Sequence, residues 1–116
     1  MIIETNLLTP RVNGIAAVDL QQIDAFLREI LNARLQSQPD EWFSLRDLLG
    51  GENRIWDNTP MQRLYEKQIN KRLPEAKAVA QAGQEAGRLF ARVVAADTRR
   101  FRTKIDKMIR HYQWAR

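Results

Sequence analysis

A chain of 116 residues, 44% of them hydrophobic and 28% charged, is long enough to bury one core, so we expect a single domain. It has no cysteine and one histidine, which excludes disulfide frameworks, cysteine-based zinc sites and thiol nucleophiles. The apolar residues from Met1 to Leu8 are too few for a signal sequence, and no stretch has the length of a membrane span. We therefore expect a cytoplasmic protein.

The net charge of +5 is unevenly distributed along the chain. Residues 1–60 hold nine acidic and five basic residues, whereas residues 61–116 hold fourteen basic and five acidic residues. The positive charge is densest from Arg88 to Arg116, where nine basic residues accompany two acidic ones. Such a concentrated positive field predicts an anionic partner, and a basic surface that only increases solubility is the simpler alternative.

The first predicted element is an amphipathic helix over about Leu20 to Gln36, with Asp19 as its N-cap and Gln22 completing a capping box. We expect residues 1–18 to form an extended N-terminal arm and residues 19–116 to form the domain. Pro39 and Asp40 then end this helix.

A short strand over Glu41 to Ser44 and a short helix over Leu45 to Leu49 are predicted next. Ser44 and Asp47 have the spacing of a second capping box. The pair Gly50-Gly51 ends the short helix, and it lacks the lysine and hydroxyl residue of a phosphate-binding loop.

Thr59 as N-cap and Pro60 as first helical residue predict the start of a third helix. Pro74 disfavours helical geometry at the preceding residue and lacks an amide donor, so a fourth helix is expected over about Glu75 to Ala96. The buried face of the third helix is predicted to consist of Met61, Leu64, Tyr65, Ile69 and Leu73.

The fourth helix has an apolar side and a polar side that carries arginines. Arg88 and Arg92 recur at helical spacing, and arginine can bond guanine while glutamine can bond adenine in a major groove. Both residue types are also ordinary on exposed helix surfaces. Gly83 and Gly87 are a hint of close packing or of close approach to a backbone. The apolar side is predicted to contain Val79, Ala82, Ala86, Phe90 and Val93.

The last segment, from Thr98 to Arg116, fits two structures. One is a β-hairpin with Asp106-Lys107 as its turn, in which Phe101 opposes Tyr112. Its apolar face would carry Phe101, Ile105, Met108, Tyr112 and Trp114, and its other face Arg100, Arg102 and Lys104. The other structure is a helix, because the apolar residues also follow helical spacing. The density of β-branched and aromatic residues favours the hairpin.

The order of these elements resembles a winged helix-turn-helix DNA-binding domain. The resemblance is one of layout, covers about Asp19 to Trp114, and is interrupted by an extra loop and helix over Glu52 to Leu73. It implies a mainly helical α+β fold with a short strand and a C-terminal β-hairpin, the fourth helix lying near the major groove and the hairpin forming a basic wing. It places Gln84, Arg88 and Arg92 near the groove and Arg100, Arg102, Lys104 and Lys107 on phosphates.

Arg99 and Arg110 belong to the same basic segment and complete the candidate set. We predict a regulatory or accessory protein that binds nucleic acid, with duplex DNA as the favoured form. The alternative is a protein–protein adaptor, in one form a homodimer, with an acidic N-terminal and a basic C-terminal surface. We expect no catalysis, metal site or cofactor. His111 is the single histidine, so it cannot form a histidine-based metal site or an acid–base pair with a second histidine. The acidic residues near Asp47 are an alternative Mg²⁺ site for a nuclease, but capping and solvation explain them more simply.

Overall fold

A computed structural model describes residues 12, 14–49, 56 and 58–116 of the chain. Within these residues the fold is helix-rich with a small antiparallel sheet, so the predicted α+β class is confirmed. The described elements are the helices α1 (Ala17–Ser37), α2 (Leu45–Leu48), α3 (Gln62–Asn70) and α4 (Glu75–Ala96) and the strands β1 (Phe43–Ser44), β2 (Phe101–Asp106) and β3 (Ile109–Trp114).

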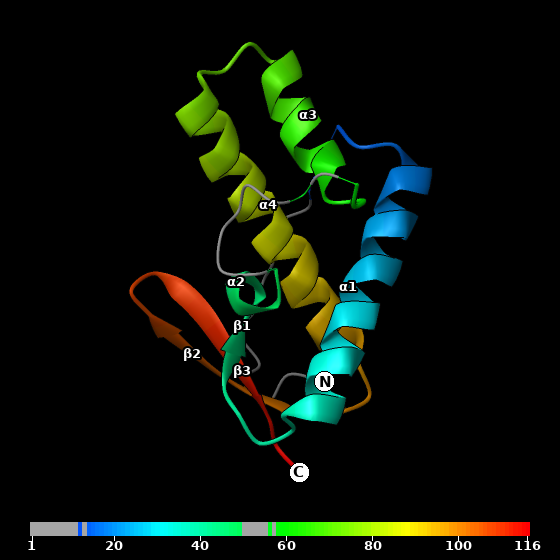
Figure 1. Ribbon diagram of the computed structural model, residues 1–116, viewed down its shortest axis with the longest axis vertical. Coiled ribbons are helices and arrows are strands. Elements are labelled where there is room, and N and C mark those ends of the chain that lie inside the picture. Colours follow the sequence, from blue (N-terminus) through cyan, green and yellow to red (C-terminus); the bar gives the residue numbers. More distant parts are fainter. Residues whose placement is uncertain (1–11, 13, 50–55, 57) are drawn as a thin grey trace.

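Helix α4 is the central element of the molecule. It contacts α3 and α1, and its C-terminal end leads into the sheet. Figure 1 shows α3 beside the upper half of α4, α1 beside its lower half, and the β2–β3 hairpin projecting to one side. The start of α4 at Glu75, directly after Pro74, agrees with the prediction.

The start of α1 differs from the predicted one. The helix begins at Ala17, and the residue before it, Ala16, makes no capping hydrogen bond through its side chain. Asp19 lies in the first helical turn, and its carboxylate is 3.6 Å from Nε of Arg63. The predicted Asp19 capping box is therefore wrong. An acidic residue in the first turn still stabilises the helix, because it interacts favourably with the helix dipole.

Residues 1–18 were predicted to form an extended N-terminal arm, and the structure describes part of this segment. Residues 1–11 and 13 lie outside the described residues. Val12 is 8% exposed and belongs to the hydrophobic core. The chain therefore packs on the domain at least at this residue.

The capping box of α2 is confirmed. The Asp47 amide donates to Ser44 Oγ at 3.1 Å, and the Ser44 amide donates to Asp47 Oδ2 at 2.9 Å. Since Ser44 is also the last residue of β1, this box connects the sheet directly to α2. The predicted stop at Gly50-Gly51 lies outside the described residues.

Helix α3 begins later than predicted and buries a different residue. Thr59 donates its hydroxyl hydrogen to the carbonyl of Trp56 at 2.7 Å and forms a turn instead of an N-cap. Ile69, predicted to be buried, is 40% exposed, whereas Gln68 is 1% exposed. The side chain of Gln68 donates to one carboxylate oxygen of Glu85, and Lys67 donates to the other. This buried polar cluster joins α3 to α4, which explains why the apolar pattern alone misplaces the buried face.

The C-terminal segment is a β-hairpin, as favoured by its composition, but its turn differs from the predicted one. The two turn residues are Lys107 and Met108, and Asp106 pairs with Ile109. Phe101 therefore pairs with Trp114 and not with Tyr112. Because the partners shift by two residues, Phe101, Tyr112 and Trp114 stay on the predicted inner face, while the predicted pairs are wrong. Ile105 and Met108 were also predicted on that apolar face, but they are 64% and 96% exposed, and Met108 lies in the turn.

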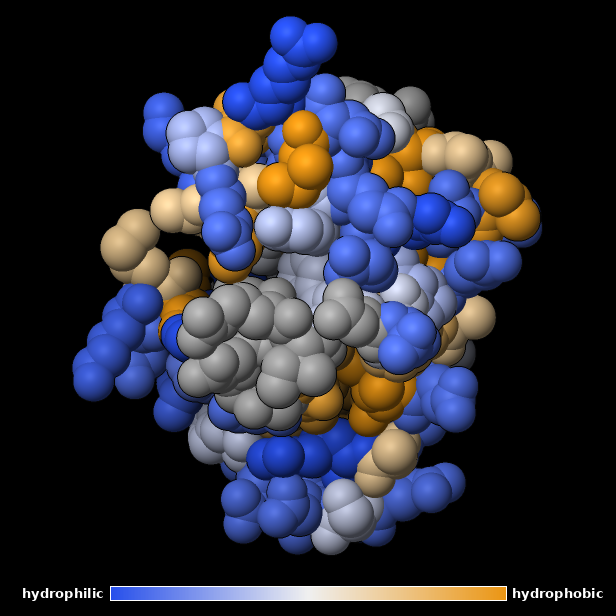
Figure 2. All heavy atoms as spheres, turned by 45° about the horizontal axis from the view of Figure 1, so that its top comes forward, coloured by the Kyte–Doolittle hydropathy of each residue, from blue (hydrophilic) through white to orange (hydrophobic). Residues whose placement is uncertain are grey.

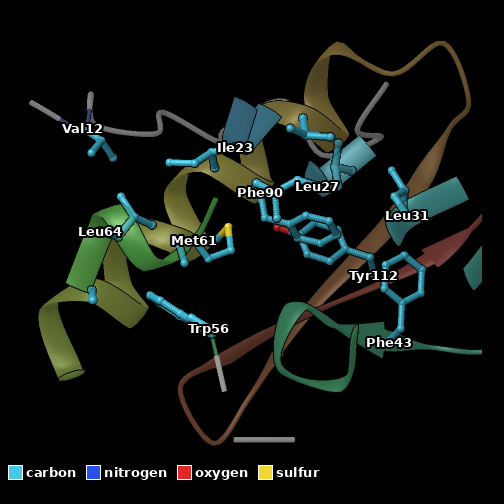
Figure 3. Packing of buried hydrophobic residues seen from close by; sticks show 14 of the residues in the cluster. Val12, Ile23, Leu27, Leu31, Phe43, Trp56, Met61, Leu64, Phe90 and Tyr112 are labelled. Atoms are coloured by element: carbon cyan, nitrogen blue, oxygen red, sulfur yellow. The ribbon is translucent and has the colours of Figure 1, made fainter. Parts of the chain in front are cut away.

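The sheet has the order β1-β3-β2, so the last strand lies between the other two. Its inner face packs on α4 and α1 (Figure 3). Phe43 lies in β1 with its ring centroid 6.4 Å from that of Phe90 in α4, and Phe101 is fully buried beside it. Leu64, Phe90 and Val93 belong to one core, and the partly buried Ile30 packs against it. The position of α4 in the core therefore agrees with the prediction.

Candidate functional site

An open groove of about 530 Å³ lies between α4, the tip of the β2–β3 hairpin and α2. One wall is formed by α4, with Gln84, Gly87 and Arg88, and the opposite wall by the hairpin tip, with Met108 and Arg110. Three elements that are distant in the sequence therefore meet at one concave surface. The groove also contains Arg46 of α2, which the sequence analysis did not select.

The α4 wall is open to an incoming molecule. Gln84 is exposed and Arg88 half-buried, and their spacing of four residues places them on the same side of the helix. Between them Gly87 is exposed, and a Cβ atom added there would meet nothing within 4 Å. A glycine in a helix interior is less favourable than alanine by about 1 kcal/mol. No packing contact among the described residues therefore explains this glycine, which leaves the backbone of α4 accessible in the groove.

The hairpin wall combines a positioned cation with exposed apolar side chains. Arg110 is half-buried on the inner face of the hairpin, where its Nη1 donates to Oγ1 of Thr103 at 3.2 Å. At the tip Ile105 is 64% exposed and Met108 is 96% exposed. Lys107 is exposed in the turn beside them. The tip is therefore a basic and apolar surface at the edge of the groove.

Two predicted site residues lie on the other face of the hairpin. Nζ of Lys104 is 4.2 Å from the ring centroid of Trp42, close enough for a cation–π contact. Nη1 of Arg102 lies 3.5 Å from Oε1 of Gln113 on the neighbouring strand. Alternation along the strands separates these two cations from Arg110. The structure thus divides the predicted wing residues between two surfaces.

Arg99 has partners within the protein. Its Nη2 lies 2.7 Å from Oδ2 of Asp97 and donates to Oδ1 of Asn32 at 2.6 Å. Its guanidinium lies 5.7 Å from the ring of Trp114. The hydrogen bond from Arg99 holds the pKa of the Asp97 carboxyl below its usual range, and the same bond raises the pKa of Arg99. Arg99 thus ties the end of α4 to α1 and the sheet, outside the groove.

The other predicted cations are exposed. Arg92 lies one turn beyond Arg88 on α4, and Arg100 lies in the link between α4 and β2. Neither lines the groove. Figure 2 shows long hydrophilic side chains around the edge of one face of the molecule, with hydrophobic side chains between them.

No sequence signal marks Arg46, because a single arginine in a short helix is ordinary. The capping box that joins α2 to β1 fixes the position of this helix beside the groove. Only the fold therefore places Arg46 with Arg88 and Arg110.

Two of the acidic residues considered for a Mg²⁺ site have other partners in the structure. Asp47 caps α2, and Asp40 lies 2.7 Å from a guanidinium nitrogen of Arg116. Within the described ranges, no group of three or more histidine, cysteine or acidic residues has the arrangement of a metal site. The helices described here include none long and apolar enough to cross a membrane.

No known protein family, curated protein or solved structure matches this chain. Its function must therefore be inferred from the groove and from the charges around it.

Proposed function

We propose that this protein binds duplex DNA in a regulatory or accessory role, through α4 and the tip of the β2–β3 hairpin. The observation that carries the proposal is the groove, in which Gln84 and Arg88 of α4 face Arg110 of the hairpin. Arginine and glutamine are the side chains that bond guanine and adenine in two places at once, and arginine also binds phosphate. A concave surface that presents these groups from two elements suits a duplex better than a flat basic face does.

The order of the elements supports a winged-helix-like arrangement. A helix, a short strand and a short helix precede α4, and a hairpin follows it. The strand order β1-β3-β2 attaches this hairpin to the domain through its second strand. Helix α4 then has the place of a recognition helix and the hairpin that of a wing, while α3 is the additional element.

The additional helix does not compete with α4 for DNA. Helix α3 packs on the first half of α4, where Lys67 and Gln68 bind Glu85. Glu85 is 8% exposed, so the side of α4 that carries it is covered by α3. Gln84 and Arg88 remain on the open side, and this is the side offered to the major groove.

In the proposed complex, one sugar–phosphate strand lies in the groove. When α4 lies in the major groove, the strand that borders that groove passes between α4 and the hairpin tip. Arg46 and Arg110 then meet its phosphates from α2 and β3, and the open space above Gly87 lets the strand approach the helix backbone. Arg102 and Lys104, on the other hairpin face, add only long-range attraction.

The test is the salt dependence of duplex binding, measured by fluorescence anisotropy with a labelled mixed-sequence duplex. Affinity should fall steeply between about 50 and 200 mM salt, with the slope set by the number of neutralised phosphates. Arg88→Ala should weaken binding to this duplex and flatten the salt slope by about one unit, because it removes one charge from the surface that faces DNA. The matched control is Arg28→Ala, which removes one charge from an exposed helix position paired with Asp24 and should change affinity little. If the folded protein binds no duplex at the lower salt concentration, the proposal is wrong.

A second candidate function is the protein–protein adaptor, favoured by the apolar part of the groove. Leu45 and Leu49 of the α2 region line it together with Met108. An adaptor of this kind would bind a protein, in one form a second copy, in the absence of DNA. Sedimentation of the protein at two salt concentrations without DNA separates this function from the first.

A further inference from the structure

The tip of the hairpin has a backbone conformation that its residues do not favour. Lys107 has φ of 51° and Met108 has φ of 66°, so both turn residues are left-handed. This is the type I′ turn, in which asparagine and glycine are preferred because their backbones tolerate positive φ. Lysine and methionine have no such tolerance. The turn is therefore less stable than the same turn built from its usual residues.

Packing does not compensate for this turn. Met108 is 96% exposed and Ile105, near it on β2, is 64% exposed, so both large apolar side chains are presented to solvent. Exposed apolar groups contribute no hydrophobic stabilisation to the fold. The exposed side chain of Met108 is thus not explained by the stability of the protein.

The surroundings of the tip favour nucleic acid as the molecule that covers it. Lys104, Lys107 and Arg110 lie within four residues of Met108, and Asp106 is the one acidic residue in that stretch. The tip also stands at the edge of the groove whose other wall is α4. An anionic, narrow and partly apolar partner fits this combination, and the space between stacked base pairs at the minor groove of DNA has these properties.

We propose that Met108 is an apolar wedge that inserts between two base pairs from the minor groove and bends the duplex. This inference rests on the proposed binding of duplex DNA by α4. With α4 in the major groove and one sugar–phosphate strand in the groove of the protein, the hairpin tip reaches the adjacent minor groove. Methionine is among the side chains that partly unstack a base step in this way, and the resulting kink toward the major groove widens the minor groove for the hairpin.

Each part of the tip has a role in this arrangement. The two-residue turn is the narrowest end that a hairpin can have, and it projects from the helical body of the molecule (Figure 1). Lys107 and Arg110 neutralise phosphates on the two sides of the minor groove. Ile105 contacts the apolar faces of the sugars beside the opened step.

The experiment measures binding and bending together, on a duplex of about 30 base pairs labelled at both ends for energy transfer. The wild-type protein should raise energy transfer between the ends. Met108→Ala should bind this duplex about tenfold more weakly and leave its ends as far apart as in free DNA. Met108→Leu, which keeps an apolar side chain of similar size, should bind and bend like the wild type.

A second duplex with a mismatched pair at its centre tests the physical cause. Unstacking is easier at a mismatch, so Met108→Ala should bind this duplex nearly as well as the wild type does. Circular dichroism on each variant establishes that the fold is unchanged.

The outcomes separate this inference from the proposed function. If the wild type binds no duplex at all, the proposed function fails. If the wild type binds without bending, or if Met108→Ala bends the duplex as the wild type does, the wedge is refuted and duplex binding stands. An affinity loss of Met108→Ala that is equal on the matched and mismatched duplexes also refutes the wedge.

Discussion

The ring of Phe90 in α4 meets the ring of Tyr112 in β3 edge to face, with centroids 5.3 Å apart and planes at 86°. This contact joins the proposed recognition helix to the middle strand of the sheet. Phe43 of β1 lies against both rings. The relative position of α4 and the hairpin, and therefore the shape of the groove between them, depends on these aromatic side chains.

The first prediction concerns this contact. Phe90→Ala should lower the free energy of unfolding by about 3–5 kcal/mol, because it removes a fully buried ring and leaves a cavity. Urea denaturation of both proteins measures the difference. Phe90→Leu is the matched control and should lose much less. A loss below about 1 kcal/mol for the alanine variant would contradict the packing described for α4.

A second prediction follows from the burial of Tyr112. Burial raises the pKa of its hydroxyl to about 12, and the positive charge of Arg110 opposes this rise. Since the folded protein favours the neutral hydroxyl, this group contributes stability below the pKa of about 10 in the unfolded chain. That contribution is lost as pH rises from there through the folded pKa. Thermal unfolding of the wild type and Tyr112→Phe at pH values from 8 to about 11 should show a steeper decline for the wild type. Parallel curves would show that Tyr112 is not the group responsible.

The third prediction concerns the polar cluster between α3 and α4. Glu85→Ala leaves Lys67 buried without its carboxylate, and breaking such a pair from one side costs about 3–5 kcal/mol. The side chains of the pair are each 11% exposed, so solvent compensates for part of this and the lower end of the range is expected. The double variant Glu85→Ala with Lys67→Met should recover much of the loss, because no uncompensated charge remains. Additive losses in the double-mutant cycle would mean that the two side chains are not coupled.

Gly87 separates folding from function in the fourth prediction. Gly87→Ala should raise the stability of the protein by up to about 1 kcal/mol, because the added methyl meets open space and alanine favours the helix. Gly87→Leu should fold equally well but weaken duplex binding roughly tenfold, about 1.4 kcal/mol, by filling the groove. Thermal melts and anisotropy titrations give the two quantities. Unchanged binding by the leucine variant would place the DNA outside the groove.

The last prediction distinguishes base recognition from general attraction. Arg92→Ala should weaken binding to a preferred sequence by about 1–3 kcal/mol and to random DNA by much less, because Arg92 lies one turn beyond Arg88 on the side of α4 proposed to contact base edges. Lys104→Ala should weaken all sequences equally and slightly, because Lys104 lies on the far face of the hairpin. Competition titrations with selected and random duplexes measure both effects. Equal losses from the two variants would indicate binding without sequence preference.

Local signals in the sequence were sufficient for several elements. The Ser44 and Asp47 pair predicted the start of α2, because a capping box needs only residues that lie three apart. Pro74 predicted the start of α4, because proline changes the backbone at its own position whatever surrounds it. The apolar side of α4 also followed from periodicity, as did the inward side of Phe101 and Tyr112 in the hairpin, whereas Ile105 and Met108 were wrongly expected on that side. For the site, the sequence placed Gln84 and Arg88 on one side of a helix.

The register of the β-hairpin and the partners of individual side chains depended on the tertiary structure, because contacts between residues distant in the sequence decide them. The turn at Lys107 and Met108 was missed because its local sequence is poor for a type I′ turn, and pairing with β1 and packing on α4 impose it. Gln68 is buried in place of Ile69 because Glu85 of another helix binds it. Arg46 and Arg110 meet in one groove, while Lys104 lies on the opposite face of the same hairpin. A sequence pattern determines which side of an element a residue occupies, but only the packing of elements determines what that side faces.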